Sequence, residues 1–252
     1  MCVLFDFDLT QAPDSFSTPL RRRGMEDPDV WREAHVQLLV ERGKEKILAR
    51  VHSLVRLSRS GATSRFTTEL VREAGGFGKP FEGVPEMSGA LRESAAAALP
   101  GLEVDSYLIT SGFSELHRAV SSAGVFANVW GTEFHFDEAG ELAIPRRTAT
   151  HPEKVRYVLQ FSAGVGTEGP DGPADVCRDV PDERMHVPLD QVVYVGDGGS
   201  DMPVSFLLHD PGGIAPTACK ADWRTTGAGS RSCAPAAACR VPRRQTTGRG
   251  SG

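Results

Sequence analysis

The spacing of hydrophobic residues changes near residue 100 of this 252-residue chain. Before that point, apolar residues such as Ile47, Val51 and Leu54 recur at helical spacing, and Asp27-Pro28 is a typical helix start. After it, short apolar runs alternate with helical segments. The pattern predicts strands at residues 2–6, 104–109, 125–130, 192–195 and 213–215, a β-hairpin over 133–144, and helices at 28–42, 45–58, 64–73, 85–99, 114–122, 153–161 and 201–208.

Alternation of strands and helices is typical of an α/β fold with a parallel sheet between two helical layers. We therefore predict a Rossmann-like, three-layer core in which the run 192–195 is a central strand. Residues 164–188 are rich in Gly, Pro and Asp, which favours an irregular surface segment. Residues 225–252 contain no Asp or Glu and almost no large aliphatic residues, so we predict a disordered tail.

Composition excludes several classes of function. The net charge of −5 disfavours nucleic-acid and anionic-membrane partners, and no apolar run approaches the ~18 residues that span a bilayer. The five cysteines are odd in number and scattered, as expected for reduced thiols in the cytoplasm. Nothing in the pattern indicates an oligomeric state.

Polar motifs follow the predicted strands where each strand ends. They are VLFDFDLT at 3–10, YLITSG at 107–112 with a turn expected through Ser111-Gly112, Lys154 at the start of a helix, and VVYVGDGGSD at 192–201. The carboxyl edge of an open parallel sheet is where ligands bind. Each motif alone is weak, because a DxD pair or a glycine-rich loop is often only a solvated turn. Together and in this order they supply the groups for phosphoryl transfer.

The acidic residues predict a metal site and a nucleophile. Asp6 and Asp8 stand two residues apart, and such paired acids cost free energy unless a cation or a proton neutralises them. Mg²⁺ prefers hard oxygen ligands, which Asp6, Asp197 and the Asp8 carbonyl can supply. A carboxylate can then attack phosphorus, while Asp8 protonates the leaving alcohol and later activates water.

The remaining groups predict a phosphate site. The hydroxyl of Thr110 and the backbone N–H groups of Ser111 and Gly112 can hold phosphate oxygens, and Lys154 adds a positive charge. We therefore expect Thr110 and Lys154 to take part in catalysis as well as in binding.

On these motifs the chain resembles the Mg²⁺-dependent phosphatases of the haloacid dehalogenase-like superfamily, with a phosphoserine-phosphatase-like layout, over residues 2 to about 218. The resemblance implies that Asp6 is the nucleophile, Asp8 the general acid/base and Asp197 a Mg²⁺ ligand, with Asp201 ligating the ion or orienting its water. It also implies a catalytic core of residues 1–11 and 100–224 and a helical cap of residues 12–99. One departure is Leu9, where the family usually has glycine.

The function that follows is hydrolysis of a small phosphomonoester through an aspartyl-phosphate on Asp6. Three alternatives remain open at this point. A phosphomutase of the same superfamily would use the same acids, and an inactive phosphatase-like protein would only bind ligands. A response-regulator receiver also pairs acids with Mg²⁺, but its length is shorter and its acid pair precedes the lysine.

Overall fold

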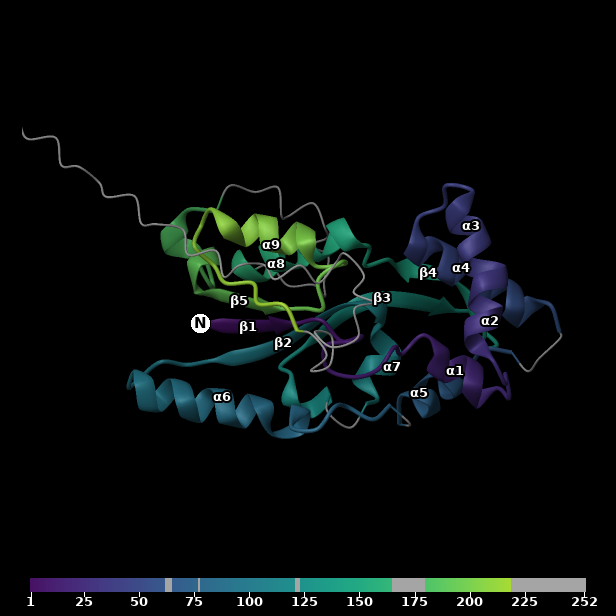
Figure 1. Cartoon of the computed structure of the whole chain (residues 1–252), viewed down its shortest axis with the longest axis horizontal. Coiled ribbons are helices and arrows are strands. Elements are labelled where there is room, and N and C mark those ends of the chain that lie inside the picture. Colours follow the sequence, from purple (N-terminus) through teal and green to yellow (C-terminus); the bar gives the residue numbers. More distant parts are fainter. Residues whose placement is uncertain (62–64, 77, 121–122, 165–179, 219–252) are drawn as a thin grey trace, which may run out of the picture.

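The computed structural model describes residues 1–61, 65–76, 78–120, 123–164 and 180–218 (Figure 1). The predicted tail at 225–252 and most of the predicted irregular segment at 164–188 lie outside these residues. Among the described residues, no helix combines the length and the apolar character needed to cross a membrane.

The centre of the molecule is a five-stranded sheet in the order β4-β3-β2-β1-β5. Strand β1 pairs in parallel with β2 and with β5, β2 pairs in parallel with β3, and β3 pairs antiparallel with β4. The strands are β1 (Cys2–Phe5), β2 (Asp105–Phe113), β3 (Val129–Phe136), β4 (Leu142–Arg147) and β5 (Val192–Val195). The predicted α/β fold and its hairpin are confirmed, and that hairpin is the one antiparallel pair among the named strands.

Helices cover both faces of this sheet. Figure 1 shows α8 and α9 on one face and α6 and α7 on the other, with α1 to α4 gathered beyond the carboxyl ends of the strands. The helices are α1 (Ser17–Arg22), α2 (Pro28–Arg32), α3 (Leu38–Glu41), α4 (Lys46–Arg59), α5 (Thr68–Gly76), α6 (Val84–Ala98), α7 (Ser114–Arg118), α8 (His151–Ser162) and α9 (Met202–His209). A π-helical segment, Glu33–Gln37, joins α2 to α3. The predicted three-layer core is therefore present.

Strand β1 is buried on both faces. Cys2 and Leu4 belong to the core cluster under α8 and α9, whereas Val3 and Phe5 belong to the cluster on the opposite side. Successive side chains of a strand point to opposite faces, so this continuous apolar run fills both cores. Each fully buried large apolar side chain contributes about 1.5–3 kcal/mol, which fixes the strand that carries Asp6 at its end.

Several predicted boundaries were wrong. Strand β2 does not end at Thr110 with a turn at Ser111-Gly112 but continues to Phe113, with a register shift against β3. The backbones can stay this close because Gly131 has no side chain; a Cβ there would lie 2.9 Å from the carbonyl oxygen of Gly112. The strand predicted at 125–130 instead begins at Val129.

The end of the sheet next to β5 also differs from the prediction. β5 is the outermost named strand, and the strand predicted at 213–215 is reduced to single parallel bridges at Ile214 and Thr217. Helix α7 ends at Arg118, earlier than the predicted residue 122, and residues 121–122 are outside the described part.

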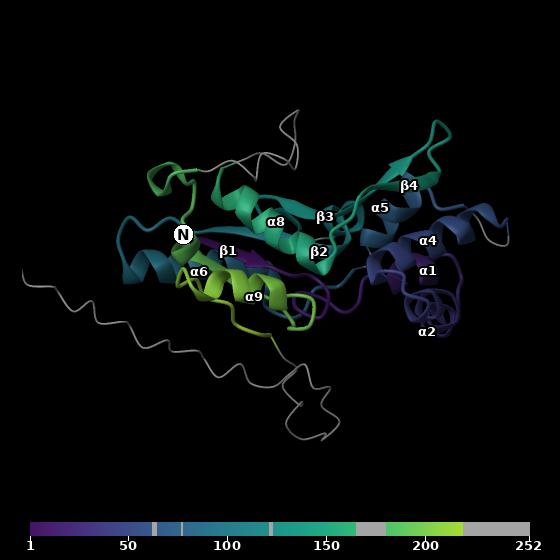
Figure 2. The same cartoon turned by 90° about the horizontal axis from the view of Figure 1, so that it is seen from above.

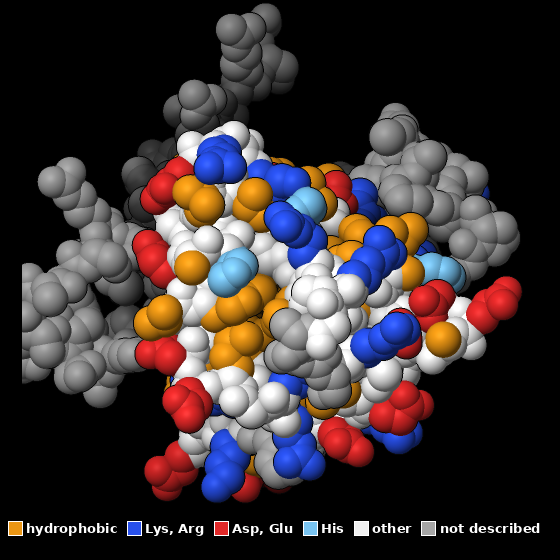
Figure 3. All heavy atoms as spheres, turned by 90° about the vertical axis from the view of Figure 1, so that its right-hand side faces the viewer, with side chains coloured by type: hydrophobic (Ala, Val, Ile, Leu, Met, Phe, Trp, Pro, Cys, Tyr) orange, Lys and Arg blue, Asp and Glu red, His pale blue; other side chains and the backbone are white. Residues whose placement is uncertain are grey.

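The helices before α6 form a group at one end of the molecule, as Figure 2 shows from above. Asp27 begins α2 as predicted, because its carboxylate accepts the N–H groups of Asp29 and Val30 at 3.1 and 3.0 Å. Seen from that end, hydrophobic side chains collect near the middle of the surface, with both acidic and basic side chains around them (Figure 3). This group corresponds to most of the helical cap that the resemblance implies for residues 12–99.

Helix α6 is different, because it packs against the sheet. Ser88 contacts Ser106 of β2 with its hydroxyl at 3.3 Å, and Arg92 donates to the carbonyl oxygen of Val104 at 3.2 Å. We therefore propose a cap of α1 to α5, with α6 counted in the core, in place of the predicted boundary at residue 99.

Candidate active site

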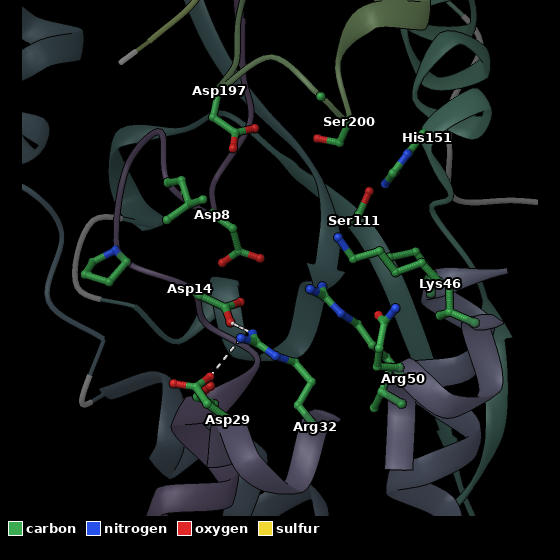
Figure 4. A pocket seen from close by; sticks show the side chains of 18 of the residues that line it. Asp8, Asp14, Asp29, Arg32, Lys46, Arg50, Ser111, His151, Asp197 and Ser200 are labelled. Carbon is green, nitrogen blue, oxygen red and sulfur yellow. Dashed lines mark hydrogen bonds and ion pairs between the residues drawn. The ribbon is translucent and has the colours of Figure 1, made fainter. Parts of the chain in front are cut away.

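A pocket of about 930 Å³ lies between the carboxyl ends of the strands and the helical group. Its sheet side holds Asp6 and Asp8 after β1, Ser111 in β2, and Asp197 after β5. The opposite wall comes from α2, the π-helical segment and α4, and the labelled side chains of both walls converge in Figure 4. The structure thus brings together residues that are up to 194 positions apart (Asp6 to Ser200).

A buried ion-pair network holds the nucleophile candidate in place. The Lys154 ammonium lies 2.9 Å from Asp6 Oδ2 and 2.6 Å from Asp201 Oδ1, and it donates to Ser200 Oγ at 3.1 Å. Tyr194 donates its hydroxyl to Asp201 Oδ1 at 2.8 Å. Lys154 has no exposed surface and does not line the pocket, so it acts on the site through the two carboxylates.

Burial and the charges of this network shift the pKa values of its side chains. Burial raises the pKa of Asp6 to about 7, with further increases from Asp201 and Asp8 and an opposing effect of Lys154. Burial alone would lower the pKa of Lys154, but the two carboxylates outweigh it and the pKa is raised. For Asp201 the cation prevails over burial, and the pKa is lowered. An additional positive charge beside Asp6 would favour its ionised form.

Three acids form a cluster with the composition of a magnesium site. One oxygen each of Asp6, Asp197 and Asp201 lies within 4.8 Å of the others. Burial and the neighbouring Asp201 raise the pKa of Asp197, while the charge of Lys154 opposes this shift. Hard carboxylate oxygens in a half-buried site fit Mg²⁺. Among the predicted metal residues, the side chain of Asp8 is outside this cluster.

Asp8 faces the same pocket from a different environment. Its carboxylate accepts the backbone N–H of Ser15 at 2.8 Å, and burial, followed by the charge of Asp14, raises its pKa. A raised pKa favours a protonated carboxyl, which is the form that a general acid needs.

The structure separates the two hydroxyls that follow one another in β2. Thr110 is fully buried, accepts the N–H of Gly112 at 3.0 Å, and contacts Nε2 of His117 at 3.5 Å; it does not line the pocket. Ser111 does line the pocket, and its Oγ is buried without a hydrogen-bond partner. A buried hydroxyl without a hydrogen-bond partner costs free energy unless a ligand supplies the missing hydrogen bond. The geometry therefore favours Ser111 over Thr110 as the phosphate-binding hydroxyl.

Several polar side chains of the pocket were not among the predicted site residues. Ser200 contacts Lys154 and lies 3.4 Å from Asp6 Oδ2, and Lys46, Arg50 and His151 line the walls. Ser200 stands inside the GDGGSD motif, so its position was a usable signal. Lys46 and Arg50 gave none, because charged residues on a helix usually face solvent.

Comparison with known proteins supports the fold at low sequence identity. No family model matches the sequence, and neither does any curated protein. A HAD family hydrolase from Salmonella enterica serovar Typhi superposes with a TM-score of 0.54 and 12% identity, over 80% of this chain and 57% of that one. The chain thus spans little more than half of that hydrolase.

Two phosphoserine phosphatase structures match more of their own length. One, in the apo form, has a TM-score of 0.53 and 17% identity over 85% of this chain and 84% of its own. The other is an analogue of the phospho-aspartyl intermediate, with a TM-score of 0.52 and 16% identity over 85% of this chain and 91% of its own. The fold is therefore that of HAD-like hydrolases of the phosphoserine phosphatase type.

Proposed function

We propose that this protein is a Mg²⁺-dependent phosphatase that hydrolyses a small phosphomonoester through an aspartyl-phosphate on Asp6. The observation that supports this most is the position of the Asp6 carboxylate. It lines the pocket, pairs with Lys154 at 2.9 Å, and shares a cluster with Asp197 and Asp201. The fold neighbours include phosphoserine phosphatases, one of them captured as an analogue of this type of intermediate.

In the first step, an oxygen of Asp6 attacks phosphorus and the bond from phosphorus to the alcohol oxygen breaks. Asp8 gives its proton to that oxygen, so the alcohol leaves neutral. In the second step, Asp8 takes a proton from water, and the resulting hydroxide attacks phosphorus. The aspartyl oxygen–phosphorus bond then breaks, inorganic phosphate leaves, and Asp6 and Asp8 are restored.

The other residues position the reacting groups and offset their negative charge. Ser111 donates its free hydroxyl to a phosphate oxygen, while Lys154 orients Asp6 and Asp201 and offsets their charge. Asp6, Asp197 and Asp201 would hold Mg²⁺, directly or through water. When bound, that ion supplies positive charge that offsets repulsion between the carboxylate and the phosphate.

The test is phosphate release from a panel of small phosphomonoesters, with Mg²⁺ and after chelation. We expect release only with Mg²⁺, no release by Asp6→Asn, and a roughly 10²–10⁴-fold slower rate for Asp8→Asn, the usual worth of acid–base catalysis. A folded wild-type protein that binds Mg²⁺ but hydrolyses none of the esters would contradict the proposal. Conversion of one ester into its isomer without net phosphate release would instead support a mutase.

A further inference from the structure

A second hollow lies between helix α4 and strand β4, outside the catalytic pocket. Its volume is about 680 Å³. Figures 1 and 2 both show α4 and β4 side by side, at the end of the molecule that carries the helical group. This α4–β4 groove shares no lining residue with the pocket at Asp6, so it is a separate surface of the protein.

The floor of the groove is apolar, and two of its aliphatic side chains are open to solvent. Leu48 of α4 and Ile144 of β4 line the groove with 43% and 56% of their surface exposed. Val55 and Pro145 extend the same apolar surface, whereas Leu48 and Ile144 belong to neither core cluster of the described residues. An exposed apolar surface with a polar rim is typical of a site that binds another molecule.

Basic side chains surround this floor. Lys44, His52, Arg56 and Arg59 line the groove, and no acidic residue does so among those that the structure describes. In that same part of the chain, no carboxylate forms an ion pair with any of the four. Burial lowers the pKa of His52, and the charges of Lys44 and Arg56 lower it further. The rim is therefore positive, although the whole chain has a net charge of −5.

The exposed edge of β4 does not favour an added β-strand. Arg59 donates to the carbonyl oxygen of Ala143 at 3.2 Å, and Pro145 has no N–H to donate. A ligand of this groove is thus recognised by its side chains and not by its backbone. Helix α4 has 14 residues and is about 21 Å long, which suits contact with about four turns of another helix.

From these features we infer that the α4–β4 groove binds an amphipathic helix of a partner protein, with large apolar side chains on one face and Asp or Glu along both sides of that face. The apolar side chains of this helix cover Leu48 and Ile144, and its carboxylates pair with the basic rim. The inference is independent of the proposed function, because no residue of the groove lines the catalytic pocket.

Other occupants fit the groove less well. A second copy of this chain, related by a two-fold axis through the groove, would place two basic rims against each other. A nucleic acid would pair with the rim but leave the apolar floor uncovered. A flat anionic membrane would meet the rim without filling the hollow.

The test is a selection of displayed helical peptides on the full-length protein. Three libraries share one helical scaffold and one randomised apolar face, and their flanking positions are Asp/Glu, Ser/Gln or Lys/Arg. We expect only the acidic library to be enriched. Its selected peptides should bind about tenfold tighter than their Ser/Gln analogues in fluorescence anisotropy, and this advantage should shrink at high salt.

Variants of the protein locate the binding site. Leu48→Ser and Ile144→Ser should each weaken the selected peptide about tenfold, because less apolar surface is buried. Arg56→Gln should weaken it and reduce its salt dependence. Leu99→Ser and Arg72→Gln are matched controls outside the groove and should leave the affinity unchanged. All five side chains are exposed, and circular dichroism of each variant checks that the fold is kept.

Several results would overturn the inference. Enrichment of no library, or equal enrichment of all three, would do so, as would peptide binding that persists in Leu48→Ser and Arg56→Gln. Binding of single-stranded DNA or of phosphatidylserine vesicles in place of peptides, lost in Arg56→Gln, would identify a surface for polyanions instead. Self-association in sedimentation experiments that Ile144→Ser abolishes would identify a second copy of the chain.

Discussion

Single residues show how neighbouring positions of one strand acquire different roles. Thr110 and Ser111 carry the same functional group, and their side chains leave β2 on opposite faces. The Thr110 hydroxyl is used inside the protein by Gly112 and His117, whereas the Ser111 hydroxyl lines the pocket unpartnered. Their substitutions should therefore separate stability from activity.

We expect Ser111→Ala to lower kcat/KM for a phosphomonoester by about 10- to 100-fold, because a hydrogen bond to a charged phosphate is lost, with little change in stability. Thr110→Val should instead cost about 1–2 kcal/mol of unfolding free energy by leaving the Gly112 N–H unpaired, with the smaller effect on kcat/KM. Steady-state kinetics and chemical denaturation of both variants measure this. If Thr110→Val were the less active enzyme, the assignment of Ser111 would be wrong.

Leu9 illustrates what one residue can reveal in sequence and in structure. It replaces the usual glycine of the resembled motif, and in the structure it has φ of +62°, the only positive φ of a non-glycine residue among those described. This conformation costs a leucine roughly 1–2 kcal/mol. Leu9 thus adopts the left-handed conformation that glycine adopts most readily, in a turn where its N–H donates to the carbonyl oxygen of Ala12 at 2.7 Å.

At the level of elements, the loop between β5 and α9 needs a glycine at position 196, because Asp201 packs where a Cβ would lie. A Cβ on Gly196 would lie 2.1 Å from Oδ2 of Asp201, the carboxylate that pairs with Lys154. The next loop glycine to compare is Gly199, where a Cβ would meet no atom within 4 Å. The two positions form a matched pair for testing how the loop holds the site.

Gly196→Ala should destabilise the protein by about 3 kcal/mol, because Asp201 must move and leave a buried cation with one partner fewer. Gly199→Ala should change the free energy of unfolding by no more than about 0.5 kcal/mol. Denaturant unfolding monitored by circular dichroism measures both. Equal stability of the two variants would show that Asp201 is not held by close packing against Gly196.

Elements were predictable where a single pattern decided them. The apolar run before Asp6, the aspartate cap of α2 and the apolar face of α4 all correspond to elements found in the structure. Predictions were wrong where pairing between strands determines the end of an element. Serine and glycine favour a turn, but β2 continues through Ser111-Gly112 because it pairs with β3 there. The sequence also did not reveal that β5 lies at the end of the strand order, because β5 is as apolar as a central strand.

Across the whole molecule, His117 joins three elements. It lies on α7, its ring centroid is 4.0 Å from that of Phe7 after β1, and it contacts Thr110 of β2. Burial lowers its pKa from 6.5 to about 3. The folded state keeps this ring neutral. The contribution of the neutral ring to the free energy of unfolding is therefore fully present above pH 6.5 and is lost as the pH falls toward 3.

Acid should therefore destabilise the fold through His117. Between pH 7 and pH 5, the wild type should lose about 2 kcal/mol of unfolding free energy more than His117→Gln, which cannot titrate. Urea denaturation of both proteins at the two pH values gives this difference, independently of any overall loss from the substitution. Parallel pH dependences would mean that the ring titrates normally in the folded protein.

The site as a whole was predictable to the level of its acids. The order of motifs along the chain predicted that Asp6, Asp197 and Asp201 converge, and the structure places their oxygens within 4.8 Å of one another. The motifs could not predict that Lys46 and Arg50 line the pocket, because the helical group that contains α4 reaches the pocket only through tertiary packing. The sequence motifs therefore indicated the chemistry of the site, whereas the residues of this wall carried no motif.

The most direct test of the account is to find the phosphoryl group on Asp6. In the Asp8→Asn variant, an aryl phosphate should still phosphorylate Asp6, because its leaving group needs no proton, while breakdown is slowed. Acid-quenched protein, digested and examined by mass spectrometry, should then carry a phosphoryl group on the peptide with Asp6, and none when Asp6 is also replaced by Asn. Phosphate on another residue, or a phosphoprotein that persists without Asp6, would contradict the central claim.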